Sequence, residues 1–220
     1  MVIPMKMKIK TIDNPYFKNF CDVIERSLTG QTSFSDCLSD MISASEDIDN
    51  KAFVYTDTNY NMETIKLDEY TKDFNIMRRL EIPELKEDHK PAAVDAVCVN
   101  KNNKWFLIEF KNKPLKKAIK STPQKMLSSF WLIAFLYSRI SKKIADESDI
   151  LKFARNNVTF ITVVSSEKNA DLEETIGATW EENGAFYTPK EFMKYKGYYF
   201  KDIYILTENG LRFFIKKFDK

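Results

Sequence analysis

Three charged residues in a β-rich part of the chain have the types and spacing suited to holding a divalent cation. Asp95 is the only charge in the apolar run Ala92–Val99. Glu109 and Lys111 stand near the end of the apolar run Trp105–Asn112. Mg²⁺ is commonly held by one or two carboxylates together with waters and substrate phosphate. A lysine beside such an ion could orient a water or neutralise charge developing at phosphorus, so the trio predicts metal-assisted phosphodiester hydrolysis.

The two runs are expected to pair as a β-hairpin, because only the polar cluster Asn100–Lys104 separates them. If the hairpin is symmetric about Asn102, Asp95 lies opposite Glu109 with Cβ atoms about 5 Å apart. Alternation along the strand places Glu109 and Lys111 on one face. The residues expected to pack into the core from the other face are Phe106, Ile108 and Phe110. Opposed carboxylates repel, and a bound cation would reverse the sign of that interaction.

The residues before the hairpin predict helices and short strands. Asn14, followed by proline, is typical of a helix start, and Gly30 of its end. A second helix is expected from about Ser35. Its inward-facing residues would be Leu38, Met41, Ile42 and Ser45. Strands are expected at 52–55 and at 74–82.

The residues after the hairpin predict a long helix at about 115–141, with an interruption at Pro123 left open. The β-branched run 157–165 predicts a central strand. Further elements are expected as a short helix at 172–176, a strand at 202–206 and a final helix at 208–218. This order of elements indicates one α/β domain over the 220 residues, with a mixed sheet.

Asp95, thirteen intervening residues and then Glu109-Phe110-Lys111 resemble the PD-(D/E)xK nuclease superfamily. The resemblance implies a restriction-endonuclease-like αβββαβ core flanked by helices, with the Asp and the ExK on adjacent strands. It implies that Asp95 and Glu109 are metal ligands for Mg²⁺ or Mn²⁺, that the backbone carbonyl of Phe110 is a further ligand, and that Lys111 is the catalytic lysine. Val94 stands where the family often has proline.

Many members of that superfamily also carry a glutamate on the first helix. Glu25 is the candidate here for a third carboxylate, at the margin of the apolar face of its helix. Glu69 and Glu81 are alternatives.

A basic segment follows the three residues. Residues 111–125 carry six lysines and no acid, which favours attraction of a phosphate backbone. The residues assigned to nucleic-acid binding are Lys113, Lys116, Lys117, Lys120 and Gln124. The expected partner is DNA in preference to RNA.

Other chemistries are excluded by composition. His89 is the only histidine, which rules out a His-rich zinc site, and the five glycines are too scattered for a phosphate-cradling loop. The three cysteines are read as reduced thiols without chemistry. Hydrophobic residues make up 44% of the chain, and the net charge is +2. No run reaches the roughly 20 residues of a membrane span, and residues 1–10 lack a signal-peptide pattern, so a cytoplasmic protein is expected.

Two alternatives to a nuclease remain. One is a catalytically inactive nuclease-fold protein that binds nucleic acid or a protein partner. The other is an unrelated α/β protein in which Glu109 and Lys111 form a surface ion pair. The aromatic residues expected in the core, and not in a base-stacking platform, are Phe130, Trp131, Phe135 and Tyr137. Oligomeric state is left open, a homodimer included.

Overall fold

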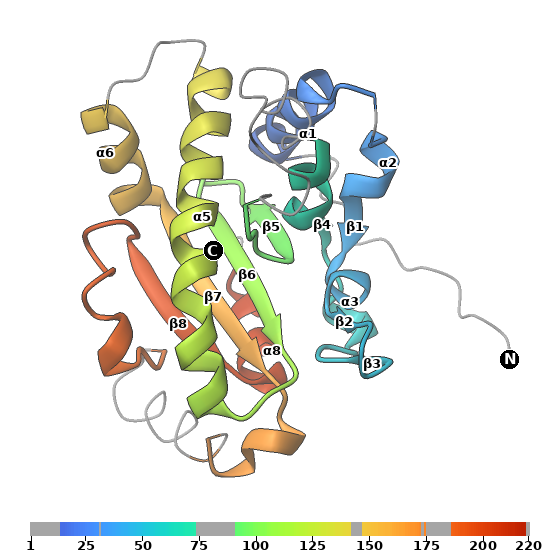
Figure 1. The fold of residues 1–220 in the computed structure, drawn as a ribbon, viewed down its shortest axis with the longest axis vertical. Helices are drawn as coiled ribbons and strands as arrows, with labels where there is room; N and C mark the ends of the chain where they lie inside the picture. Colours follow the sequence, from blue (N-terminus) through green and yellow to red (C-terminus); the bar gives the residue numbers. More distant parts are fainter. Residues whose placement is uncertain are drawn as a thin grey trace, which may run out of the picture.

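A computed structural model of the chain describes residues 14–30, 32–73, 91–141, 147–172, 174 and 186–218. Within these residues, a mixed β-sheet carries helices on both of its faces (Figure 1). The protein is therefore of the mixed α/β class, as the order of elements predicts.

The main sheet has six strands, which lie in the spatial order β1 (Leu38–Asp40), β4 (Glu63–Ile65), β5 (Ala96–Val99), β6 (Trp105–Lys111), β7 (Val158–Val164) and β8 (Asp202–Leu206). The first four are mutually antiparallel neighbours, and β6, β7 and β8 run parallel. Two further short strands, β2 (Glu46–Asp47) and β3 (Ala52–Phe53), form a separate antiparallel pair.

The helices are α1 (Pro15–Ser27), α2 (Phe34–Cys37), α3 (Met41–Ala44), a helical segment at 67–73, α5 (Leu115–Ser141), α6 (Glu147–Asn157) and α8 (Glu208–Lys216), with 3₁₀ turns η1 (Thr58–Tyr60), η3 (Glu167–Asn169) and η4 (Lys190–Phe192). Helix α5 provides the crossover between the parallel strands β6 and β7. Among the described residues, no helix is both long enough and apolar enough to cross a membrane.

Both faces of the sheet are buried. Alternate residues of a strand point to opposite faces, and each face packs into its own hydrophobic core. Trp105 and Leu107 of β6 pack with residues of α1, α5 and α6. Phe106, Ile108 and Phe110 pack with α3 and α8 on the opposite face, which confirms the face predicted for them. Glu109 shares the parity of Trp105 and Leu107, so its side chain lies under α5.

The strongest local signals in the sequence are confirmed. Asn14 caps α1 by accepting hydrogen bonds from the next helical N–H groups, and α5 has the predicted limits. The helix continues through Pro123. In the turn before it, the hydroxyls of Ser121 and Thr122 donate to carbonyls of their own helix, at 2.8 Å for Thr122 to Ala118.

The second predicted helix is wrong in its length. Residues 38–40 leave the helical path and pair with β4 as the edge strand β1. Asp40 then starts the separate short helix α3 by accepting a hydrogen bond from Ser43 N at 2.8 Å. Helix α6 was not predicted from the sequence. The strand expected at 74–82 lies outside the described residues.

One buried amide anchors the start of α5 to the loop after β7. Asn169 Oδ1 accepts a hydrogen bond from Leu115 N at 2.6 Å, and its NH₂ group donates to Lys113 O at 3.0 Å and Ser165 O at 2.8 Å. Asn169→Ala is therefore expected to lower the free energy of unfolding by about 2 kcal/mol, because buried groups lose their partners. Urea denaturation measures this. The exposed Asn59→Ala should stay within about 0.5 kcal/mol of wild type; an equal loss in both variants would contradict the anchoring role.

Candidate metal-binding active site

The hairpin register brings Asp95 and Glu109 together. Ala96 pairs with Ile108 and Val97 with Leu107, which confirms the predicted symmetry, and the next pair in this series is Asp95 with Glu109. Asp95 directly precedes β5, and its Oδ2 accepts a hydrogen bond from the backbone N–H of Phe110 at 2.7 Å. The carboxylate of Asp95 is thus fixed against β6 beside Glu109.

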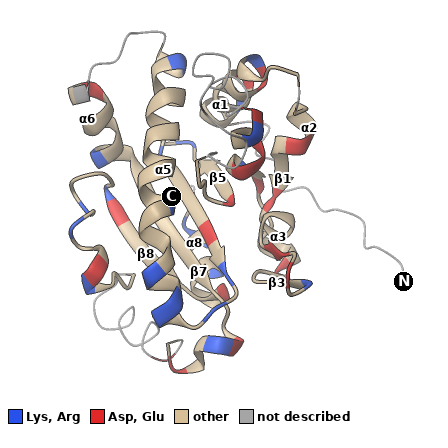
Figure 2. Cartoon of the chain, viewed as in Figure 1, with Lys and Arg blue, Asp and Glu red and all other residues tan. Residues whose placement is uncertain are grey.

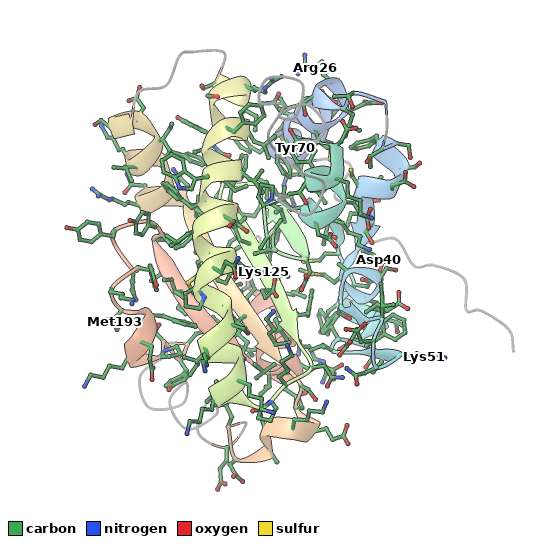
Figure 3. All side chains as sticks on the ribbon, viewed as in Figure 1. Arg26, Asp40, Lys51, Tyr70, Lys125 and Met193 are labelled. Carbon is green, nitrogen blue, oxygen red and sulfur yellow. The ribbon has the colours of Figure 1, made fainter. Side chains whose placement is uncertain are left out.

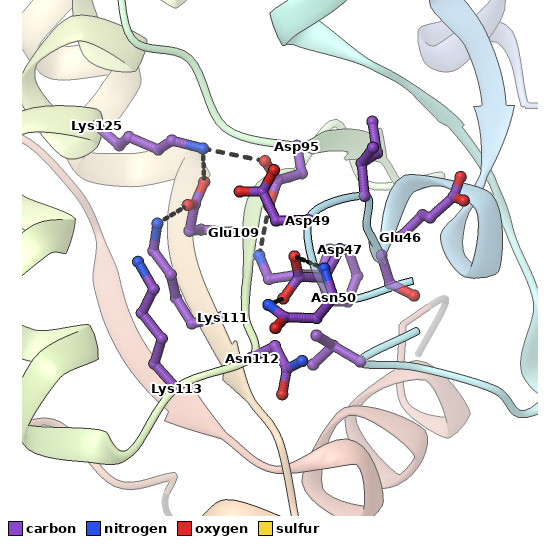
Figure 4. A pocket seen from close by; sticks show the side chains of 14 residues that line it. Glu46, Asp47, Asp49, Asn50, Asp95, Glu109, Lys111, Asn112, Lys113 and Lys125 are labelled. Atoms are coloured by element: carbon purple, nitrogen blue, oxygen red, sulfur yellow. Dashed lines mark hydrogen bonds and ion pairs between the residues drawn. The ribbon is translucent and has the colours of Figure 1, made fainter. Parts of the chain in front are cut away.

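A second lysine, Lys125 of α5, contacts both carboxylates. Its Nζ lies 3.0 Å from Asp95 Oδ1 and 2.8 Å from Glu109 Oε2. Figure 3 places Lys125 where α5 crosses the sheet, and Figure 4 shows its ammonium group between the two acids. One cation therefore already reaches an oxygen of each carboxylate.

Glu109 is fully buried, and Lys111 pairs with its second oxygen. Burial raises the pKa of Glu109 to about 7, and the neighbouring Asp95 adds to this rise against the opposing charges of Lys125 and Lys111. Burial alone would lower the pKa of Lys125, but Glu109 and Asp95 raise it above its usual value. Both oxygens of Glu109 are thus occupied by lysine ammonium groups.

These groups line a cavity of about 420 Å³ (Figure 4). One wall is the end of β6, with Glu109, Lys111 and the following Asn112. The other wall is the β2–β3 hairpin, which contributes residues 45–50 and Val54. The site is therefore open to a ligand while its central carboxylate is buried.

The structure does not bring Glu25 to this cavity. Helix α1 packs through Phe17, Phe20 and Ile24, and Glu25 points to solvent. Glu69, an alternative candidate, pairs instead with Lys72. Glu81, the other alternative, lies outside the described residues.

Besides Asp95 and Glu109, three further acids line the cavity, and they come from the β2–β3 hairpin. They are Glu46, Asp47 and Asp49. Asp47 accepts hydrogen bonds from Asn50, which shapes the turn between the two strands. Asp68, on the helical segment 67–73, has a raised pKa because it is buried and because Asp95 is near. The acid-rich stretch 46–49 was the available sequence signal for this wall.

The basic residues of 111–125 divide between the cavity and the surface. Lys113 lines the cavity beside Lys111. Four further candidates are exposed along the first turns of α5: Lys116, Lys117, Lys120 and Gln124. Figure 2 shows blue Lys and Arg positions along the first turns of α5 and at the end of β6. Their arrangement leaves the nucleic-acid role as a prediction.

Lys125 is the site residue that the sequence did not single out. It was one of six lysines in the run, without a role of its own. Ala118, Thr122 and Ser129 form the buried row of α5, and Lys125 falls between them at helical spacing. That spacing was the signal that could have separated Lys125 from its solvent-facing neighbours.

One aromatic residue departs from its predicted place. Phe130 is buried, and Phe135 and Tyr137 are half-buried against the core, but Trp131 is 66% exposed. Trp131 lies outside the buried rows of α5, so its ring remains on the surface although the surrounding sequence is apolar.

The donor set suits a hard cation such as Mg²⁺ or Mn²⁺. Asp95 and Glu109 present oxygens that one cation reaches, and both carboxylates line the cavity. Within the described ranges, no cluster of three or more His, Cys, Asp or Glu side chains has metal-binding geometry. Two carboxylates completed by waters and substrate oxygens would therefore be the ligand set.

Comparisons with protein-family models, with curated proteins and with solved structures returned no match for this chain.

Proposed function

We propose that this protein is a metal-dependent nuclease of the PD-(D/E)xK type that hydrolyses phosphodiester bonds, in DNA in preference to RNA. The observation that carries the proposal is the convergence of Asp95 and Glu109 on one cation, Lys125 Nζ, at the edge of an open cavity. A surface ion pair between Glu109 and Lys111 would leave Glu109 exposed, and it is fully buried.

The order of elements supports a restriction-endonuclease-like core in a single domain. Helix α1, the antiparallel strands β4, β5 and β6, helix α5 and strand β7, parallel to β6, occur in this order, with shorter elements and α6 between some of them. Taken without those intervening elements, this is an αβββαβ order, with Asp95 and Glu109 at the end of its second and third strands that lies away from their turn. The first strand of this core would be β4, in place of the run 74–82.

Each residue of the site has a role in this proposal. Asp95 and Glu109 would hold Mg²⁺ or Mn²⁺, together with the backbone carbonyl of Phe110. A divalent ion held there supplies Lewis acidity at the phosphoryl oxygen and lowers the pKa of water. Lys111, at the open end of β6, would orient the attacking water and offset the charge that develops at phosphorus.

Exposed lysines would extend this site toward a longer substrate. Lys113 and the first turns of α5 offer positive charge next to the cavity, and most nonspecific affinity for nucleic acid comes from neutralising phosphates. Binding is expected to weaken as salt increases.

The proposal is tested by incubating the protein with single- and double-stranded DNA and RNA in Mg²⁺, Mn²⁺ or EDTA. We expect cleavage with either metal and none with EDTA. Asp95→Asn should lower the cleavage rate by roughly 10²-fold or more, because it removes a charged ligand. Glu25→Gln is the matched control and should cleave as the wild type does.

Cleavage that persists in EDTA, or in Asp95→Asn at the wild-type rate, would refute a nuclease built on this site. Metal-independent binding of nucleic acid without cleavage of any substrate would instead support the inactive nuclease-fold alternative.

A further inference from the structure

Every carboxylate oxygen at the proposed metal site already has a partner. Asp95 Oδ2 accepts the backbone N–H of Phe110, and Asp95 Oδ1 lies 3.0 Å from Lys125 Nζ. The oxygens of Glu109 are divided between Lys111 and Lys125. In the part of the chain that the structure describes, only the Lys125 ammonium group touches both acids, and so it takes the bridging place that a shared cation needs.

The formal charges of this cluster cancel, since two carboxylates face two ammonium groups. A divalent ion added with all four groups in place would leave net positive charge in a largely buried site. Three cations would then share two carboxylates at short range, where Coulomb repulsion is poorly screened. One of the two lysines must move away from the carboxylates, and their contacts indicate which one.

We propose that Lys125 is an internal counter-cation that holds Asp95 and Glu109 together before metal binding and must release them when the metal binds. This inference rests on the proposed function for its metal. Lys111 pairs with Glu109 alone and would keep its place on β6. Lys125 would therefore lower the affinity of the site for metal, and metal binding would be coupled to movement of its side chain.

The surroundings of Lys125 permit such a movement without moving its helix. One turn later on α5, Ser129 Oγ accepts a hydrogen bond from Val94 N at 3.1 Å, which ties α5 to the chain entering β5. The side chain of Lys125 is 24% exposed and lines the cavity, so its flexible stem can swing into open volume. The backbone is thus held while the ammonium group is able to leave.

The test measures Mn²⁺ binding by isothermal titration calorimetry on the metal-free 220-residue protein at pH 7.5. Lys125→Met and Lys125→Gln should each bind Mn²⁺ at least tenfold more tightly than wild type, because a competing cation is removed. Lys152→Met removes the same charge from an exposed position of α6 and should stay within twofold. Adding Asp95→Asn to Lys125→Gln should abolish the gain.

A second measurement uses the wild type, so it does not depend on how the variants fold. Acetic anhydride labelling followed by mass spectrometry should show that the reactivity of Lys125, relative to the exposed reference Lys152, increases when Mn²⁺ is added. Equal or weaker Mn²⁺ binding by both Lys125 variants, or an unchanged labelling ratio in metal-loaded wild type, would overturn the proposal.

These outcomes are separate from those of the proposed function. Tighter metal binding by the Lys125 variants, without cleavage by any of the proteins, would sustain the counter-cation and overturn the nuclease. Metal-dependent cleavage, with the affinity for Mn²⁺ unchanged in the Lys125 variants, would sustain the nuclease and overturn the counter-cation. Absence of Mn²⁺ binding in every protein would overturn both.

Discussion

Glu109→Gln is expected to reduce metal-dependent cleavage of nucleic acid by roughly 10³-fold, about the loss seen when a principal electrostatic group is removed from an active site. Glutamine keeps the shape of the buried side chain but removes the negative charge that would hold the cation. The ion pairs to Lys111 and Lys125 would also be lost, while Lys125 retains Asp95. Initial rates with labelled DNA at saturating Mg²⁺ measure the effect.

The control for this experiment is Glu191→Gln, the same substitution at an exposed glutamate of η4. Its cleavage rate should equal that of wild type. Circular dichroism establishes that Glu109→Gln is folded. A folded Glu109→Gln variant with more than half of the wild-type rate would contradict the assignment of Glu109 as a metal ligand.

Wild-type protein without metal is expected to lose stability relative to Glu109→Gln as the pH rises from about 4.5 to about 7. The pKa of Glu109 is raised from 4.5 to about 7 by its burial and by Asp95. Between these values the unfolded chain releases the proton while the folded protein keeps it, so increasing pH favours unfolding. Above the folded pKa the difference levels off. The separation of the two pKa values corresponds to at most about 3 kcal/mol.

Urea denaturation in EDTA at pH 5, 6, 7 and 8, for wild type and Glu109→Gln, measures this difference. Other titrating groups contribute equally to the pH dependence of stability in both proteins. The comparison therefore isolates the contribution of Glu109, which includes its interactions with Asp95, Lys111 and Lys125. Adding Mg²⁺ should reduce the loss in wild type, because metal binds the ionised carboxylate. If the free energy of unfolding depends on pH identically in the two proteins, ionisation of the buried Glu109 carboxylate does not lower stability.

Much of the hairpin and the elements around it could be predicted, because their signals are local. The apolar runs on either side of Asn100–Lys104 indicate two strands, and the register expected for a turn symmetric about Asn102 is confirmed. Asn14 and the long periodic segment 115–141 define α1 and α5. The edge strand β1 could not be predicted, since residues 38–40 are extended only because β4 lies beside them.

The candidate site was predicted only where its residues are close in sequence or opposed across one turn. Asp95, Glu109 and Lys111 meet these conditions. The placement of the β2–β3 hairpin acids at the cavity depends on contacts between segments that are far apart in the sequence. The same is true of the direction of the Lys125 side chain, which points toward the two carboxylates. For the same reason the third carboxylate assigned to Glu25 was misplaced, because the packing of α1 turns that side chain to solvent.

The sequence by itself therefore predicted two adjacent strands with Glu109 and Lys111 on one face, because strand alternation and a short turn are local features. The register that opposes Asp95 to Glu109 was conditional on a symmetric turn, and the structure confirms it. Only the tertiary structure decided what stands between those carboxylates. Helix α5 crosses the sheet over Glu109, excludes water from it and inserts the ammonium group of Lys125. Burial and long-range charge depend on the whole packed fold, and no local pattern of residues specifies them.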